Sequence, residues 1–445
     1  MTSGEIPTIA AREFDCSGAA IGRSVFTYRH VDPDETLQGE SNRSHMESFQ
    51  PSVSLFLRRM FLPVDYPSSV RSEYLEYQTW DTIQALCSYL RGVLCLTAVL
   101  DASGVGDESA SAIAAAMVWV MRDGFGMVGS LLFSYVASSH MDSNIKEWRL
   151  FADVANDVGL TLDMLAPLFR RNFALVSSLA TMCKALCGVA AGCTKTSITA
   201  HFALKANMAD LSAKENAQET AVNVCGMFLG IKVASYVANS PLVTWTIFAA
   251  LSALHSVIIY PCVSALHLDT LNKQRTMILV RDFRAGRHDR MHPRGVSMQE
   301  RLWVPLLLWW RHRKLGARLD TIAPTGRCYR RLRGIFGVER FMAARISSGY
   351  FGVVLSTAVM PEDMIKAYFF CLVCQEAASQ ESRGTRGSVE EQGYSHLEEA
   401  LAYTHENFGK FMSLLREHDW KVEDPLLGYG PWRCEWDPST RLKHE

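Results

Sequence analysis

The chain lacks the motifs that most often reveal a chemical reaction. Its 445 residues contain no glycine-rich phosphate loop, no Gly-x-Ser-x-Gly nucleophile elbow and no His-Glu-x-x-His metal motif. One Cys-x-x-Cys pair, Cys371 and Cys374, stands in an apolar setting without the second pair that a zinc site needs. We therefore expect no enzyme, no resident cofactor and no metal.

The twelve cysteines also lack the spacing of a disulfide framework, and several lie in apolar segments, where a free thiol behaves as a small hydrophobe. The N-terminus has no basic stretch followed by an apolar run, so a cleaved secretory signal is not expected. Residues 1–50 carry four Arg against eight Asp and Glu and few periodic apolar residues. They are expected to form a polar, flexible tail.

Charge is scarce in the middle of the chain. Residues 85–100 contain only Arg91, residues 173–193 only Lys184, and residues 233–268 no Asp, Glu, Lys or Arg at all. A membrane-spanning helix needs roughly 20 apolar residues, so the last stretch is long enough to span, with a possible break at Asn239-Ser240-Pro241. We expect a mainly α protein whose residues 51–275 form a helical membrane-type bundle. A soluble bundle with buried charges is the alternative.

Basic residues follow that apolar stretch. Residues 273–345 carry eighteen Lys and Arg against five Asp and Glu, and we expect residues 276–345 to form a basic linker. Aromatic and basic side chains together suit the lipid headgroup layer on the cytoplasmic side. The predicted interfacial residues are Trp309, Trp310, Arg311, Arg313 and Lys314. A solvated linker and a nucleic-acid patch are the alternatives, but no nucleic-acid module is visible, so no nucleic acid partner is expected.

The last hundred residues have the pattern of a small α+β domain, 346–445. A short strand is expected at 352–356 and a helix at 364–378. Ser395 and Glu398 match a capping box before a further amphipathic helix. Earlier in the chain, Gly226 and Gly230 have the spacing of close helix packing, against either another copy or another helix of the same chain.

A polar island, residues 207–220, separates two apolar segments. It supplies a candidate binding surface at one end of the bundle, made of Asp210, Lys214, Glu215, Gln218 and Glu219. The structural alternative is a capped turn between helices. Ser212 and Glu215 match a capping box, with a helix beginning near Ala213.

Two further groups of polar residues interrupt apolar surroundings. Arg122 and Asp123 precede a glycine-rich stretch, and charges at membrane depth are often functional. Asp153, Asn156 and Asp157 share one face of an expected helix at 146–165, because positions three and four apart are neighbours. They are candidates for binding a cation or ligand, and a solvated helix face is the alternative.

Many short blocks of this sequence resemble, in order, those of the root UVB sensitive family. The resemblance covers residues 61–275 and is looser in the C-terminal domain. The blocks include Phe61-Leu62-Pro63, Trp80-Asp81, Arg122-Asp123-Gly124, Trp148-Arg149-Leu150, Asn156-Asp157, the polar island, and Thr270-Leu271-Asn272 with Gln274-Arg275. The resemblance implies membrane association and a protein partner, either a paralogue or the chain itself. It implies no established catalysis. Plant members are linked to UV-B-dependent seedling development, auxin transport and vitamin B6 homeostasis.

The leading hypothesis is therefore a membrane-associated regulatory or scaffolding protein, in contact with membrane lipid and a protein partner. The alternative is a membrane transporter of a small polar or anionic metabolite. A binder of a pyridoxal-phosphate-related ligand is the third hypothesis, which depends on the family resemblance alone.

Overall fold

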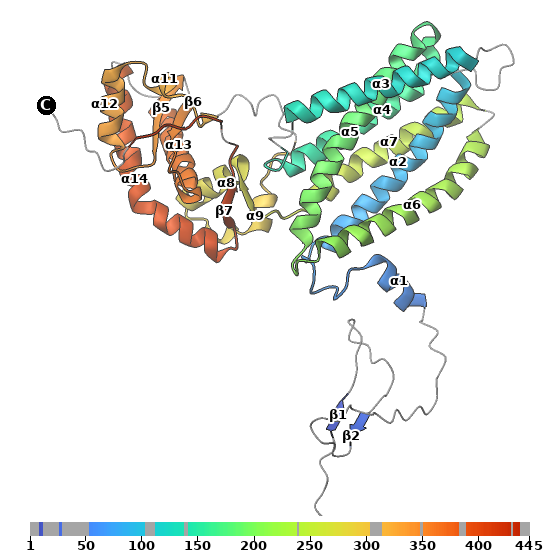
Figure 1. The fold of residues 1–445 in the computed structure, drawn as a ribbon, viewed down its shortest axis with the longest axis horizontal. Helices are drawn as coiled ribbons and strands as arrows, with labels where there is room; N and C mark the ends of the chain where they lie inside the picture. Colours follow the sequence, from blue (N-terminus) through green and yellow to red (C-terminus); the bar gives the residue numbers. More distant parts are fainter. Residues whose placement is uncertain are drawn as a thin grey trace, which may run out of the picture.

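The computed structural model is mainly α and has two lobes, a bundle of long helices and a smaller α+β lobe (Figure 1). It describes residues 9–11, 26–28, 53–102, 112–137, 141–237, 240–302, 314–347, 350–381, 389–428 and 430–436. The elements up to the end of the bundle are β1 (Ile9–Ala11), β2 (Phe26–Tyr28), α1 (Val53–Phe61), α2 (Tyr74–Ala102), α3 (Ala112–Ala137), α4 (Ile145–Leu165), η2 (Ala166–Asn172), α5 (Phe173–Phe202), α6 (Met208–Val237) and α7 (Pro241–Ser264). This agrees with the predicted fold class.

Helices α2 to α7 alternate in direction along the bundle. Ion pairs join Asp81 to Arg149 and Arg91 to Asp157, so α2 and α4 run parallel to each other. The connections between α4 and α5 and between α6 and α7 are short and reverse the chain. The start of α2 and the end of α7 therefore lie at the same end of the bundle, which we call the lobe-side end.

Five stretches of the described chain are long and apolar enough to cross a membrane, where the sequence pattern predicted one clear case. They are Tyr74–Ala102, Ala116–Ala137, Ile145–Phe202, Met208–Val237 and Pro241–Ser264. The third stretch contains both α4 and α5, with a non-helical residue, Phe169, between them. The predicted break lies where expected, because α6 ends at Val237 and α7 begins at Pro241.

Single charges inside apolar segments do not interrupt the helices. The apolar stretch 85–100 is part of one longer helix, α2, with Arg91 fully buried in it. Gly226 of α6 packs against the ring of Tyr89 on α2, and Gly230 against Val93. The glycine pair thus serves contacts within the chain, which decides between the two alternatives that the spacing left open.

The α+β lobe begins earlier than the predicted domain boundary. Its elements are β3 (Thr270–Asn272), α8 (Lys273–Arg284), η3 (His288–Arg290), α9 (Pro293–Ser297), β4 (Lys314–Leu315), α11 (Leu319–Ile322), α12 (Gly326–Ile335), β5 (Phe341–Ser347), β6 (Tyr350–Leu355), α13 (Pro361–Glu381), α14 (Val389–Glu417) and β7 (Lys421–Leu426). Strand β6 lies between β4, its parallel partner, and β5, its antiparallel partner, while β3 pairs in parallel with β7.

The described parts of the basic segment 276–345 are folded, although a linker was expected. Ile278, Phe283 and Phe336 are buried in one core with Phe369 of α13 and Phe411 of α14. In α8 and α12 the apolar side chains enter the core, and most of the arginines stay at the surface, although Arg275 and Arg333 are buried. Net charge was therefore a poor guide to folding here.

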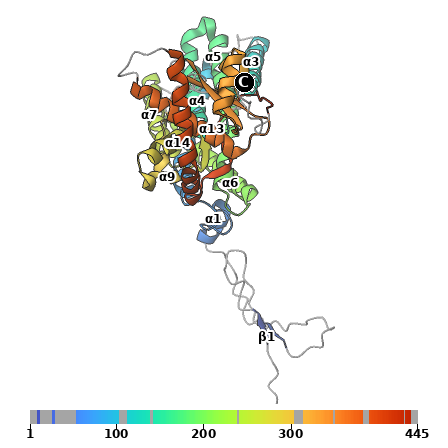
Figure 2. The same cartoon turned by 90° about the vertical axis from the view of Figure 1, so that its left-hand side faces the viewer.

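The predicted membrane-interface residues Trp309, Trp310, Arg311 and Arg313 lie outside the described residues. Lys314 is the first residue of β4, in register with Gly352 of β6. Seen from the side, the α+β lobe and the bundle overlap, with α1 below both (Figure 2).

Candidate functional site

A cavity of about 480 Å³ lies among α2, α4, α5 and α6, in the half of the bundle at the lobe-side end. Six charged residues contribute to its wall: Asp81, Arg149, Asp153, Lys195, Glu215 and Glu219. Of the predicted binding residues, the cavity brings together Asp153 from one group and Glu215, Gln218 and Glu219 from another. The rest of the wall includes Tyr77, Ala85, Gly192 and Ile198, so charge is set in a partly apolar surface.

Carboxylates outnumber cations in this wall. Arg149 pairs with Asp81, and Lys195 Nζ lies 3.0 Å from Glu219 Oε2. Glu215 has no cationic partner within salt-bridge distance among the described residues, and its two oxygens accept neutral hydrogen bonds. Glu215 is therefore without an ion-pair partner among the described residues, and Asp153 has only a long ionic contact, 4.0 Å from Arg149 Nε.

Several polar atoms in the wall lack a hydrogen-bond partner although they are buried. Three are acceptors, Oε1 of Gln84, Oδ2 of Asp153 and Oε1 of Gln218, and one is a donor, Nε of Arg149. Gln84 and Asp153 are only 3% and 8% exposed. A buried polar atom without a partner costs roughly 1–3 kcal/mol, so this wall favours a ligand or waters that donate hydrogen bonds.

Beyond the cavity, two groups of charged residues lie at successive depths along α4, and we call them tiers. In the first, Asp157 lies 2.6 Å from Arg91 Nη1 and 3.1 Å from His255 Nδ1, while Asn156 donates to Ser88. Sequence analysis predicted Asp157 and Asn156 as ligand candidates, but their partners are side chains of α2 and α7.

In the second tier, Asp163 accepts from Lys184 and lies 3.4 Å from Arg122 Nη2. Arg122 also donates to Thr181 at 3.0 Å, and its guanidinium lies over the ring of Trp119. Its neighbour in sequence, Asp123, is exposed and lies on a different face of α3. The structure therefore separates the two charges that the sequence placed together.

Most of the predicted binding surface on the polar island is occupied by the chain itself. Asp210 accepts from the backbone of Val64 at 2.8 Å, Lys214 donates to the carbonyl of Arg59 at 2.6 Å, and Gln218 to that of Phe61 at 2.6 Å. These three side chains fix α1 and the turn after it against α6. A docking face for a partner was expected here, and only Glu219 is exposed as predicted.

The helix at the island begins at Met208, five residues before the predicted start. Ser212 lies within it, and Glu215 accepts from Gln78 and Thr199. The predicted capping box is therefore wrong, because contacts to neighbouring helices take the polar groups that a capping box would use.

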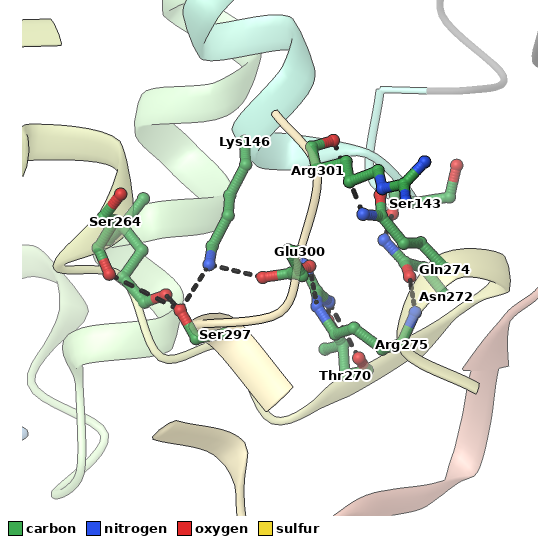
Figure 3. A network of polar contacts seen from close by, with 11 residues as sticks. Ser143, Lys146, Ser264, Thr270, Asn272, Gln274, Arg275, Ser297, Glu300 and Arg301 are labelled. Atoms are coloured by element: carbon green, nitrogen blue, oxygen red, sulfur yellow. Dashed lines mark hydrogen bonds and ion pairs between the residues drawn. The ribbon is translucent and has the colours of Figure 1, made fainter. Parts of the chain in front are cut away.

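A buried ionic junction that sequence reasoning missed connects the bundle to the α+β lobe (Figure 3). Lys146, at the start of α4, pairs with Glu300 and donates to Ser297 at 2.7 Å. Arg275 of α8 reaches the other oxygen of Glu300 at 2.8 Å. Burial alone would raise the pKa of Glu300, but Arg275 and Lys146 together hold it below its usual value. The only sequence signal was the Gln274-Arg275 block.

A second charged cluster, which we call the Asp269 cluster, gathers the chain segments at the lobe-side end. Asp269 lies 2.5 Å from Arg71 Nη2 and 3.4 Å from Lys421 Nζ of β7. His201, at the end of α5, lies between Asp269 and Glu73. Burial would raise the pKa of Asp269, yet the nearby His201 ring and the charges of Arg71 and Lys421 hold it well below its usual value.

These features define a class: a bundle of long apolar helices, five stretches of which are long and apolar enough to span a membrane, with a charged internal cavity and a docked α+β lobe. Two family models match the chain. One, described as "Vitamin B6 photo-protection and homoeostasis domain", matches residues 48–286. The other, "Root UVB sensitive protein, C-terminal", matches residues 291–436. The chain belongs to the root UVB sensitive family, as the resemblance predicted.

Named relatives agree with this membership. Protein root UVB sensitive 3 of Arabidopsis thaliana is 33% identical over 85% of this chain and 86% of its own length. RUS family member 1 of Dictyostelium discoideum is 43% identical over 50% of this chain and 43% of its own. Protein root UVB sensitive 2, chloroplastic, of Arabidopsis thaliana is 33% identical over 58% of each. No solved structure matches.

Proposed function

We propose that the chain is a membrane protein that binds a small polar metabolite inside its helical bundle and carries it across the bilayer without changing it chemically. The observation that carries this proposal is the charged cavity, walled by four apolar helices. Ionisable groups at membrane depth are costly, and they usually face a bundle interior or a water-filled pathway. A cavity of this size also suits a metabolite, since small-molecule pockets span roughly 300–1,000 Å³.

The alternating helices set the orientation in this proposal. Since α2 and α7 meet at one end, the segment before α2 and the α+β lobe face the same side of the membrane. Basic residues favour the cytoplasmic side, and the segment 273–345 carries eighteen Lys and Arg against five Asp and Glu. The cavity is then in the cytoplasmic half of the bundle.

The charge of the wall selects the ligand class. Glu215 has no ion-pair partner among the described residues, Asp153 has only the 4.0 Å contact with Arg149, and three of the four unpartnered atoms are acceptors. An ammonium group satisfies such a wall, because it supplies both positive charge and hydrogen-bond donors. An anion would meet the two carboxylates directly. We therefore favour an amine over the anionic metabolite that the sequence left possible.

The matched family description directs the choice among amines. Pyridoxamine, a form of vitamin B6, carries an ammonium group, whereas pyridoxal 5′-phosphate carries a phosphate and auxin a carboxylate. We expect pyridoxamine to bind in the cavity and the two anions to be excluded. A link to auxin transport would then be indirect.

Calorimetry on the purified chain in lipid nanodiscs tests this proposal, with pyridoxamine, pyridoxal 5′-phosphate and indole-3-acetate as probes. Asp153→Asn should weaken pyridoxamine binding about tenfold or more, because it removes a charge-assisted hydrogen bond. Uptake of labelled pyridoxamine into proteoliposomes should fall in parallel.

Asp101→Asn is the matched control. Asp101 is an exposed carboxylate of the same helix bundle at the far end of α2, so its loss should leave binding unchanged. If none of the three probes bound, the proposed metabolite would be contradicted. If wild type and the Asp153→Asn variant bound pyridoxamine equally well, the proposed site would be contradicted.

A regulatory or scaffolding role is the second candidate. Its predicted docking face on the polar island is largely used within the chain, so it needs another surface. The outward faces of α3 and α6 supply one, and their charges favour assembly with a protein partner.

A further inference from the structure

Two lone charges stand out on the outer surface of the bundle. Among the described residues of α2 to α7, Asp123 and Lys232 are the exposed charged side chains that have no ionic partner and lie more than one turn from a helix end. Every other charge inside these helices is buried, paired or close to an end.

Each of the two charges interrupts an apolar face. Asp123 on α3 is flanked one turn away on either side by Val120 and Met127, which are 70% and 72% exposed. Next to it, the position of Gly124 is open, with no atom within 4 Å of an added side chain. The short side chain of Asp123 lies about three turns or more from either end of α3, so its carboxylate cannot reach either membrane surface.

Lys232 has the same kind of setting on α6. Phe228 and Tyr236, one turn before and one turn after it, are 60% and 75% exposed. Helix α6 packs on α2 through Gly226 and Gly230, and the exposed Lys232 lies on the side of α6 that faces away from α2.

Contacts inside the bundle place the two charges at nearly the same depth. Arg122, next to Asp123, reaches Asp163 of α4. Leu160, one turn before Asp163, accepts from Cys95 of α2. Cys95 is level with Lys232, because Val93 of α2 contacts Gly230, two residues before that lysine. The depths of Asp123 and Lys232 therefore differ by about one helical turn, roughly 5 Å.

The two helices lie on opposite edges of the bundle. Helix α3 packs on α5, where Gly126 meets Thr181, and α6 packs on α2. Figure 1 shows α3 along one edge of the bundle and α6 along the other, with α5, α4 and α2 between them. The charges are too far apart to pair within one molecule.

We infer that copies of this chain assemble in the membrane by packing α3 of one copy against α6 of the next, with Asp123 paired to Lys232. This inference depends on the proposed membrane location, since in water both charges would be solvated and neither would need an ion-pair partner. In lipid, an unpaired carboxylate at mid-depth is costly, and a cation at the same depth on a second copy neutralises it. Gly124 allows the close approach that helix packing in membranes uses.

The contact joins two different surfaces of the chain, so it is head-to-tail. A two-fold dimer through α3 would bring two Asp123 carboxylates together, which repels. A head-to-tail contact in one membrane plane closes into a ring when its rotation allows closure.

Charge reversal in two differently tagged, co-expressed copies tests the inference. Wild-type copies should co-purify in mild detergent. Asp123→Lys in both copies places Lys against Lys, and Lys232→Asp in both places Asp against Asp, so each should reduce co-purification about tenfold. Mixing one Asp123→Lys copy with one Lys232→Asp copy restores opposite charges at both possible contacts and should restore co-purification.

Glu76→Lys is the matched control, because Glu76 is an exposed carboxylate near the end of α2 and should have no effect. Carbonate extraction of the same membranes tests the membrane location separately from the assembly of copies. Release of the wild-type chain would overturn the membrane location and this inference with it. Retention of the wild type without co-purification, or reversal variants that insert and still co-purify alone, would overturn only the inference.

Discussion

The polar residues that the sequence singled out are almost all used, but mainly for holding the chain together. Asp210, Lys214 and Gln218 bind backbone carbonyls and amides near α1, and Asp157 and Arg122 have partners on neighbouring helices. Their importance could be predicted from isolated polarity in apolar surroundings. Their partners could not, because each lies about 20 to 160 residues away in sequence and only the fold brings it close.

At the residue scale, the Asp269 cluster gives a prediction for stability. Asp269→Asn leaves Arg71 and Lys421 without their carboxylate, so we expect it to lower the free energy of unfolding by about 2 kcal/mol at neutral pH. The loss is below that of a fully buried pair, since Lys421 is half exposed and water screens it. Thermal unfolding of the detergent-solubilised protein measures the change.

The stabilities of the wild type and the Asp269→Asn variant should become similar in acid. The folded pKa of Asp269 is lowered, so its contribution is complete above the unfolded value of about 4 and disappears as pH falls through the folded value. The difference in melting temperature between wild type and the Asp269→Asn variant should therefore shrink below about pH 4. A difference that stays constant from pH 7 to pH 3 would refute this role.

At the scale of elements, periodicity predicted which segments are helices better than where they begin. The break before Pro241, the strand β6 and the helices α13 and α14 were predicted. Helix α2 extends well beyond the apolar stretch 85–100, and Arg91 within that stretch is neutralised by Asp157. The described parts of the basic segment 276–345 were assigned to a linker because summed charge hides the amphipathic pattern of α8 and α12.

Helix α1 supports a prediction at this scale. Its exposed side chains Val53, Phe56, Leu57 and Met60 follow one another at helical spacing, and no residue of α1 is buried. A helix with one apolar face and nearby arginines suits the membrane surface, and α1 is fixed at the lobe-side end, where the proposed spans reach the bilayer boundary. We expect it to lie in the headgroup layer.

Phe56→Gln together with Leu57→Gln should make tryptic cleavage after Arg58 and Arg59 about tenfold faster in liposomes, because the apolar face no longer holds α1 in lipid. In detergent, where no bilayer shields the site, the double variant and wild type should be cleaved at similar rates. Equal rates in liposomes would show that α1 stays in water.

At the scale of the whole molecule, two buried ionic clusters make the bundle and the α+β lobe one structure. Lys146, Glu300 and Arg275 form one of them, and Asp269 with its partners forms the other. The first joins the start of α4 to the lobe, and the second joins Arg71, from before α2, and His201, at the end of α5, to the lobe. Any movement of the lobe-side ends of α4 or α5 would therefore strain ion pairs and hydrogen bonds that reach the lobe.

The central claim is that α2 to α7 cross a bilayer in alternation around the cavity. The most direct measurement is the accessibility of two epitope tags in sealed vesicles that resist carbonate extraction, one tag at the C-terminus and one inserted after the exposed Arg170 of η2. We predict that the two tags lie on opposite sides of the membrane. Tags on the same side, or release of the chain by carbonate, would contradict the account.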